Sequence, residues 1–127
     1  MGRAIEREAE TQDYFSNNWT DTQIQILDSS PAFDNTGLTQ YIKLEYLNEA
    51  SEYGGFNRQT GFGYLQVSCY HKSRKLSISL SDKVKTFFDC KDLDLDIHSK
   101  LGQQYPTINL ENGYFLTMVQ FRIEQES

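Results

Sequence analysis

The clearest pattern of hydrophobic and polar positions lies between Gly61 and Cys90, where an alternating segment is followed by a helical one. Leu65, Val67 and Cys69 fall on one side of an extended strand, and the residues between them fall on the other. A period of two is typical of a half-buried strand. After the polar stretch His71–Lys75, apolar residues recur at helical spacing: Leu80, Val84, Phe87 and Phe88. This spacing predicts a helix that packs across the strand.

The N-terminal part of the chain predicts one helix and two strands. Arg3–Asn17 is polar, with acidic residues in its first half, where negative charge suits a helix N-terminus. Its loose apolar stripe consists of Ile5, Ala9 and Phe15, and Trp19 is expected to pack the helix exit onto the core. Thr22–Leu27 alternates and predicts a strand. Thr39–Leu47 predicts a second strand, with one apolar face made of Ile42, Leu44 and Tyr46.

The C-terminal part predicts an edge strand and a hairpin. In Lys91–His98 three aspartates alternate with apolar residues, which favours an edge strand with a solvated acidic face over a calcium loop, because the calcium pattern needs a central Gly and a closing Glu. Tyr105–Glu111 and Tyr114–Glu124 are joined by Asn112-Gly113, a dipeptide typical of a turn with two positive φ angles. The last strand should turn Phe115, Val119, Phe121 and Ile123 to one side. The whole pattern predicts a single α+β domain over residues 1–127: a mostly antiparallel mixed sheet of about five to six strands, with an N-terminal helix and a second helix packed on the sheet.

Charge and composition narrow the classes of partner. The net charge of −6 argues against direct nucleic-acid recognition, which needs clustered Lys and Arg. The small basic cluster Lys72, Arg74 and Lys75 is interpreted as a solvated connector. No apolar run approaches the ~20 residues of a membrane helix, and the charged N-terminus does not predict export. Cys69 and Cys90 are expected to be a buried strand thiol and a helix-end thiol in a reducing compartment.

The sequence contains no pattern that predicts a catalytic, cofactor or metal site. Cys69 and His71 share a strand face without a third ligand at zinc spacing, and His98 has no neighbour of defined geometry. The glycine-rich link precedes a strand and not a helix, so it does not resemble a phosphate loop. A nucleophile pair of Cys90 with His98 stays open as a weak alternative. The chain is therefore predicted not to be an enzyme.

The long link from Asn48 to Gly61 is the best candidate for a protein interface. Aromatic residues and arginine on a glycine-rich loop are typical of such interfaces. The predicted contact residues are Tyr53, Phe56, Asn57, Arg58 and Gln59. The alternative is a plain hairpin tip without a partner.

The order of elements resembles a known family. The features are Phe15-Ser-Asn-Asn-Trp19 at a helix end, the strands Thr22-Gln-Ile-Gln-Ile26 and Tyr41-Ile-Lys-Leu44, a glycine-rich link into Gly61–Val67, the helix Ser81–Phe88 and a closing hairpin. Together they resemble the tail terminator, or tail completion, proteins of long-tailed bacteriophages, of the lambda gpU type. The resemblance covers nearly the whole chain and depends on element order and spacing.

This resemblance implies a structural role in the virion. Such proteins form a homo-hexameric ring that caps the tail tube, ends tube polymerisation and provides the interface for head–tail joining. The implied partners are other copies of the chain, the tail tube protein and a head–tail connector or neck protein. The implied location is the head-proximal end of the tail, with assembly in the host cytoplasm. The alternatives are a neck adaptor or tube protein of the same virion and, in another class, a small cytoplasmic protein-binding module.

Overall fold

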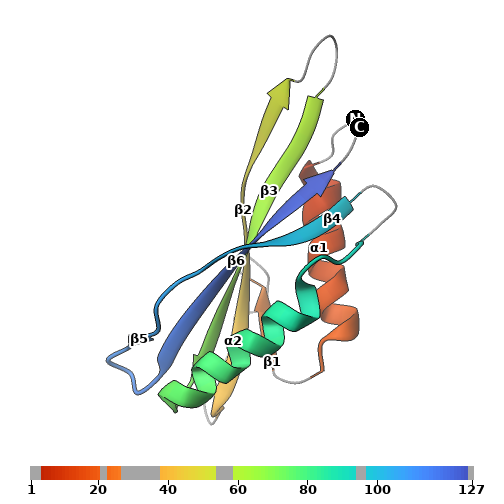
Figure 1. Ribbon diagram of the computed structural model, residues 1–127. Coiled ribbons are helices and arrows are strands. Elements are labelled where there is room, and N and C mark those ends of the chain that lie inside the picture. The colour runs from red at the N-terminus through yellow and green to blue at the C-terminus, as the bar shows by residue number, and fades with distance from the viewer. Residues whose placement is uncertain (1–3, 21–22, 27–37, 54–58, 94–96, 126–127) are drawn as a thin grey trace.

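The computed structural model describes residues 4–20, 23–26, 38–53, 59–93 and 97–125 of the chain. Its elements follow in the order α1 (Ala4–Asn18), β1 (Gln23–Ile26), β2 (Gln40–Tyr53), β3 (Gln59–His71), α2 (Arg74–Phe88), β4 (Ile97–Gln104), β5 (Ile108–Asn109) and β6 (Phe115–Gln125). The sheet has the strand order β1-β2-β3-β6-β4, and β5 pairs with β6 (Figure 1). β1 runs parallel to β2, and the other pairs are antiparallel. The predicted α+β class with a mostly antiparallel mixed sheet is confirmed.

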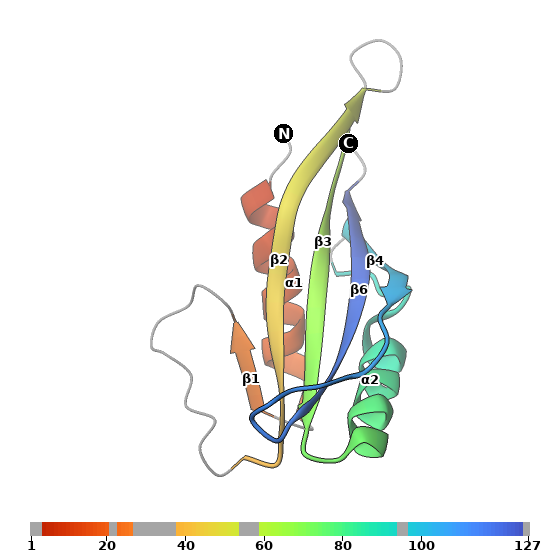
Figure 2. The same cartoon turned by 90° about the vertical axis from the view of Figure 1, so that its left-hand side faces the viewer.

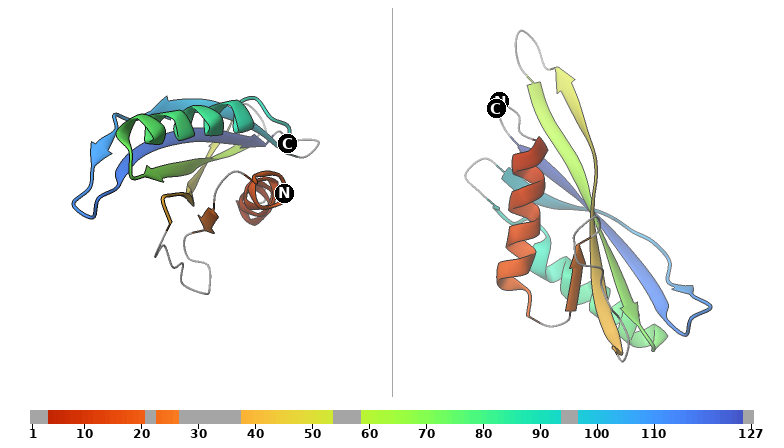
Figure 3. Two further views of the ribbon diagram at one scale, coloured as in Figure 1. Left: turned by 90° about the horizontal axis from the view of Figure 1, so that it is seen from below. Right: turned by 180° about the vertical axis from the view of Figure 1, so that it is seen from behind.

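Both helices pack on one face of the twisted sheet. Figure 2 shows the opposite face, which no helix covers among the described residues. α1 lies behind β2 and β3, and α2 lies along β6, as the views from below and behind in Figure 3 also show. The core fills the space between the helices and the sheet, so the helix-covered face is the structural centre of the molecule.

The central strand and helix are confirmed. The inward side chains Leu65, Val67 and Cys69 are fully buried in β3. However, α2 begins at Arg74, well before the predicted stripe, and Ser73 caps it by accepting a hydrogen bond from the Leu76 N–H at 3.4 Å. From the sequence, the basic residues Lys72, Arg74 and Lys75 are interpreted as a connector, because positive charge in the first turn of a helix opposes the helix dipole. Of these three residues, only Lys72 precedes the helix in the structure, and the exposed side chains of Arg74 and Lys75 belong to its first turn.

The predicted stripe of α1 is only partly right. Phe15 is fully buried and Trp19 is nearly so, but Ala9 is exposed, and the side chain of Ile5 lies outside the described set. Buried polar residues replace the missing apolar ones, since Arg7 and Thr11 face the core. The Thr11 hydroxyl donates to the Arg7 carbonyl at 2.7 Å, so its burial leaves no unpaired polar group. The stripe could not be found from hydrophobicity alone.

The link predicted from Asn48 to Gly61 is largely strand. β2 continues to Tyr53, which pairs with Gln59 at the start of β3, and the register shifts between Leu47 and Ala50. Backbone hydrogen bonds between two long strands do not require apolar side chains, so the polar composition was misleading. Residues 54–58 lie outside the described residues, as do 27–37, which include the predicted loop Ala32–Gly37.

The predicted edge strand Lys91–His98 is wrong in position. β4 begins only at Ile97 and runs to Gln104, and before it only Asp92 forms an isolated bridge, to His98, among the described residues. The inward position between Ile97 and Leu101 is Ser99, which is buried because its hydroxyl donates to the Phe88 carbonyl. A serine at an inward position hides the alternation that predicts a strand. The predicted acidic residues Asp94 and Asp96 lie outside the described residues.

The closing hairpin lies where it was predicted, but with a different turn. Gly113 has a φ of 90°, whereas Cys90 is the only non-glycine among the described residues with a positive φ, so Asn112 does not adopt one. The Gly113 N–H donates to the Leu110 carbonyl at 3.3 Å, which is the arrangement of a longer hairpin loop with glycine in its last position. The strand before the turn is short, in part because Pro106 cannot donate to the ladder.

The last strand, β6, buries the side chains that were predicted to share one face, except at its first residue. Val119, Phe121 and Ile123 are fully buried, and Phe115 is only half-buried. Thr117 occupies the inward position between them, where its hydroxyl lies 2.9 Å from that of Ser77 on α2. This contact ties the start of α2 to β6 and orients the helix across the sheet.

Candidate protein-interaction surfaces

Two of the five predicted interface residues, Tyr53 and Gln59, lie at a projecting end of the sheet. β2 and β3 extend past the other strands there (Figure 1). Tyr53 and Gln59 form the last described pair of the ladder between β2 and β3. Phe56, Asn57 and Arg58 lie outside the described residues. The backbone thus brings Tyr53 and Gln59 together, and the role of all five residues stays a prediction.

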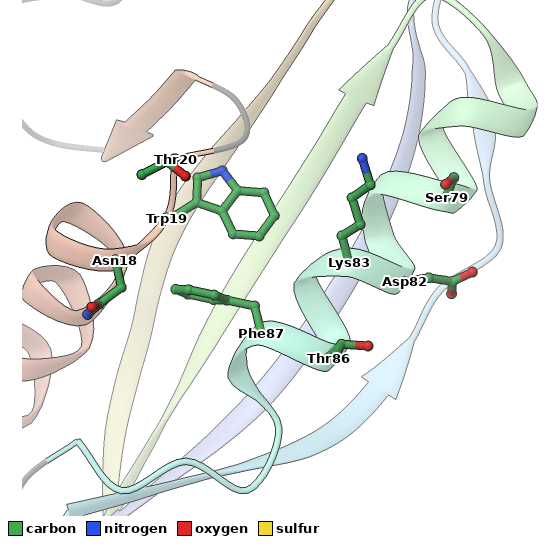
Figure 4. A pocket seen from close by; sticks show the side chains of 8 residues that line it. All are labelled: Asn18, Trp19, Thr20, Ser79, Asp82, Lys83, Thr86 and Phe87. Atoms are coloured by element: carbon green, nitrogen blue, oxygen red, sulfur yellow. The ribbon is translucent and has the colours of Figure 1, made fainter.

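A groove opens between the end of α1 and the outer side of α2. We call it the α1–α2 groove; its volume is about 540 Å³ and it is open to solvent on one side (Figure 4). It is lined by Asn18, Trp19, Thr20, Ser79, Asp82, Lys83, Thr86 and Phe87. The sequence predicted that Trp19 and Phe87 would pack, but it did not predict that they would form the floor of one groove. The signal in the sequence that could have indicated the groove is the aromatic residue near the end of each predicted helix, Trp19 and Phe87.

The floor of the groove is part of a packed aromatic cluster. The Phe87 ring meets Trp19 edge-on at 5.1 Å between centroids, and it also contacts Phe15 at 4.9 Å and Tyr14 at 5.2 Å. Phe87 is only partly buried, unlike Phe88 beside it, so one side of its ring faces the groove. Aromatic floors with polar rims are typical of protein-binding surfaces.

The rim of the groove carries polar and charged side chains from α2. Lys83 and Thr86 are exposed, and Asp82 forms an ion pair with Lys85 at 3.0 Å. Asp82 is thus partly compensated by a cation on its own helix, and Lys83 adds a positive charge to the rim. None of the eight lining residues is a histidine or cysteine, and the groove presents hydroxyl, amide, carboxylate and ammonium groups around its aromatic floor.

The helix-free face of the sheet holds a second, smaller cluster that the sequence did not reveal. Tyr41 stacks on Tyr70 at 4.6 Å, and Tyr114 meets both rings edge-on. Lys43 lies 5.2 Å above the Tyr70 ring, and Lys72 lies 5.4 Å above that of Tyr114. Burial, and the neighbouring Tyr41, raise the pKa of Tyr70. Because Tyr41 and Tyr114 are buried, this cluster stabilises the sheet more than it offers a surface to a partner.

The short strand β5 carries an exposed apolar residue. Ile108 is 46% exposed, and among the described residues only Leu76 is comparable for a large apolar side chain, at 48%. Ile108 pairs with Leu116 of β6, which pairs with Tyr70 of β3 in turn. Residues 108–114, which we call the β5–β6 turn, therefore extend the helix-free face to the side of the molecule opposite α1 (Figure 3).

The outer edge of β4 is closed by the segment after α2. The Ser99 N–H donates to the Lys91 carbonyl at 2.8 Å, and the Leu101 N–H donates to the Asp89 carboxylate at 2.8 Å. Leu93 donates its N–H to the Ile97 carbonyl at 2.8 Å. These bonds occupy groups that another strand would otherwise use, so this part of the edge is protected from strand addition.

The weak Cys90–His98 alternative gains no support from the contacts. His98 lies 2.7 Å from an Asp92 carboxylate oxygen, which corrects the expectation that it has no defined neighbour. The Cys90 thiol donates to Asp89 at 3.4 Å, and that carboxylate raises the pKa of the thiol, which makes it a poorer nucleophile. Burial raises the pKa of the Cys69 thiol still more strongly. The two cysteines are free, and no cluster of three metal-ligating side chains occurs among the described residues.

Comparisons with known proteins concern the fold. No family model and no curated protein matches the chain. A solved structure whose name states no activity covers 99% of this chain and 98% of its own, with a TM-score of 0.63 and 8% sequence identity. In all 29 solved chains match, so the arrangement recurs in other proteins. At such low identity the likeness shows the fold alone. Within the described residues, neither helix has the length and apolar character needed to cross a membrane.

Proposed function

We propose that this chain is a virion protein of long-tailed bacteriophages that caps the tail tube as a homo-hexameric ring. The ring ends tube polymerisation and provides the surface for joining the head. The observation that carries the proposal is the element order of the described residues: helix, short strand, long hairpin, helix, the strand β4 and a closing hairpin. This is the order on which the resemblance to the tail terminator proteins depends.

Two features of the structure support a role in assembly. The long β2–β3 hairpin reaches beyond the body of the sheet, where it can contact a neighbouring ring (Figure 1). The molecule also has different surfaces on its two sides, the α1–α2 groove and the β5–β6 turn. A contact between two different surfaces generates a closed ring when its rotation divides the circle, and an open filament otherwise.

A terminator must bind the last tube ring without offering a further surface for tube growth. Such discrimination is a difference of affinities and depends on repulsive elements as well as attractive ones. The net charge of −6, the polar helix α1 and the segment Asn48–Thr60 are candidate sources of this discrimination. The implied partners are the tail tube protein on one face and a head–tail connector or neck protein on the other. The protein is then located at the head-proximal end of the tail, after assembly in the host cytoplasm.

The alternatives differ in their assembly state. A neck adaptor or tube protein of the same virion also assembles, but a tube protein continues into filaments. A cytoplasmic protein-binding module remains monomeric and uses the α1–α2 groove to bind a partner. Light scattering after size exclusion, combined with negative-stain electron microscopy, separates these cases. We expect closed rings with the mass of six chains. Filaments would favour the tube protein, and a strict monomer that never engages tail tubes would favour the binding module.

A further inference from the structure

The α1–α2 groove has an aromatic floor, and the β5–β6 turn carries an exposed aliphatic side chain, Ile108. The geometry points to a contact in which the β5–β6 turn of one copy enters the α1–α2 groove of the next, with Ile108 as the apolar anchor. This inference deepens the proposed function and rests on it, because it names the surfaces that close the ring. The occupant of the groove is thus a second copy of this chain.

The turn is a preorganised projection. The Thr107 hydroxyl lies 2.7 Å from that of Thr117, and the Leu110 N–H donates to the Tyr114 carbonyl at 2.8 Å. These bonds hold both sides of the turn to each other, while Ile108 remains 46% exposed. A projection that is ordered before binding loses little conformational entropy on docking.

The groove complements this projection. Its aromatic floor of Trp19 and Phe87 suits an aliphatic side chain, and the groove is open enough to solvent for a projecting turn to reach that floor. The rim carries Lys83 beside Asp82, whose carboxylate is paired with Lys85, and the turn carries the exposed Glu111. Opposite charges across the contact matter here, since copies with a net charge of −6 repel each other.

The two surfaces lie on opposite sides of the molecule. α1, whose end lines the groove, lies on one side, and the β5–β6 turn lies on the other (Figures 1 and 3). A contact between them is therefore head-to-tail and leaves each copy with one surface of each kind for the next neighbour. Hydrogen bonds close part of the β4 edge and disfavour the addition of a strand there. The aromatic rings of Tyr41 and Tyr114 on the helix-free face are buried, which disfavours association through them.

Disulfide trapping tests the contact directly. The variant combines Ile108→Cys with Thr86→Cys on the rim of the groove, in a Cys90→Gly background that removes the exposed native thiol. Cys69 is fully buried and does not interfere. We expect mild oxidation to give a ladder of intermolecular species that ends at six chains. In the matched control, Ala9→Cys on the exposed side of α1 replaces Thr86→Cys, and no ladder should form.

A charge placed on the anchor gives a second, independent measurement. Ile108→Asp should increase the dissociation constant for self-association at least tenfold in sedimentation velocity, while Asn109→Asp adds the same charge to the neighbouring exposed position and should have little effect. Circular dichroism verifies that both variants fold. Equal effects of the two variants would overturn the assignment of Ile108 as the anchor.

The outcomes separate this inference from the proposed function. A wild-type protein that forms rings of six chains, together with no trapping at the Cys pair, overturns the turn-in-groove contact and leaves the ring standing. A wild-type protein that stays monomeric, shows no trapping and does not engage tail tubes overturns both.

Discussion

Removing the ring of Phe88 or of Phe87 should have clearly different effects on stability and on the fluorescence of Trp19. Phe88 is fully buried and contacts Phe15 at 4.8 Å and Phe121 at 5.0 Å between ring centroids. It therefore connects α2 to both α1 and β6. Phe88→Ala should lower the free energy of unfolding by about 3–5 kcal/mol, because the change leaves a cavity that the packed sheet cannot fill.

Phe87 is partly exposed at the groove, so its truncation opens a surface depression and not a closed cavity. Only part of the transfer free energy of the ring is lost, together with its contacts to neighbouring rings. We expect Phe87→Ala to cost about 1–3 kcal/mol. Trp19 is the only tryptophan in the chain and lies edge-on to Phe87 at 5.1 Å. Phe87→Ala should therefore shift native-state tryptophan emission to longer wavelength.

Urea titration followed by circular dichroism measures both costs, and fluorescence of the native state reports the local change. The exposed neighbour Thr86→Ala is the matched control and should change stability by less than about 0.5 kcal/mol. The reasoning is refuted if Phe87→Ala costs as much as Phe88→Ala, or if Phe88→Ala costs less than about 1 kcal/mol. Either result would mean that α2 packs against the sheet through a different face.

Three further predictions concern the turn after α2, the segment His71–Ser73 before α2 and the predicted interface loop. Cys90 has a φ of 55°, a left-handed conformation that glycine adopts without the steric penalty of a Cβ atom. Cys90→Gly should therefore stabilise the protein by about 1 kcal/mol, whereas Cys90→Ala should not. A loss of urea resistance in the glycine variant would contradict this prediction. His71 is buried, which lowers its pKa, and its Nδ1 accepts the Ser73 N–H at 2.9 Å. The neutral, buried imidazole of His71 stabilises the folded state. This stabilisation is fully present above the ordinary histidine pKa of 6.5 and is lost as pH falls through the lowered pKa of His71. Urea titrations from about pH 7.5 to about pH 5 should show this loss in the wild type, and a His71→Asn variant with the same slope would count against it. Arg58→Glu should weaken assembly without changing the circular dichroism spectrum, and unchanged assembly by sedimentation would show that the loop is not an interface.

The sequence by itself determined the features that depend on local periodicity. The alternation through Leu65, Val67 and Cys69 and the helical stripe that ends in Phe88 fix the direction of each side chain relative to its own backbone. The position of Gly113 in the turn likewise follows from its freedom to adopt a positive φ. These properties need no partner element, so they can be read without the fold.

The tertiary structure alone decided where polar groups are buried and which distant segments meet. Thr11 and Ser99 lie inside because a carbonyl oxygen is available to each, and hydrophobicity patterns carry no information about such partners. The long β2–β3 ladder likewise arises from backbone pairing between strands. The α1–α2 groove joins Trp19 to Phe87, and its shape depends on the packing of two helices on one sheet. Periodicity assigns a side chain to a face, but only packing determines which surfaces remain open to a partner.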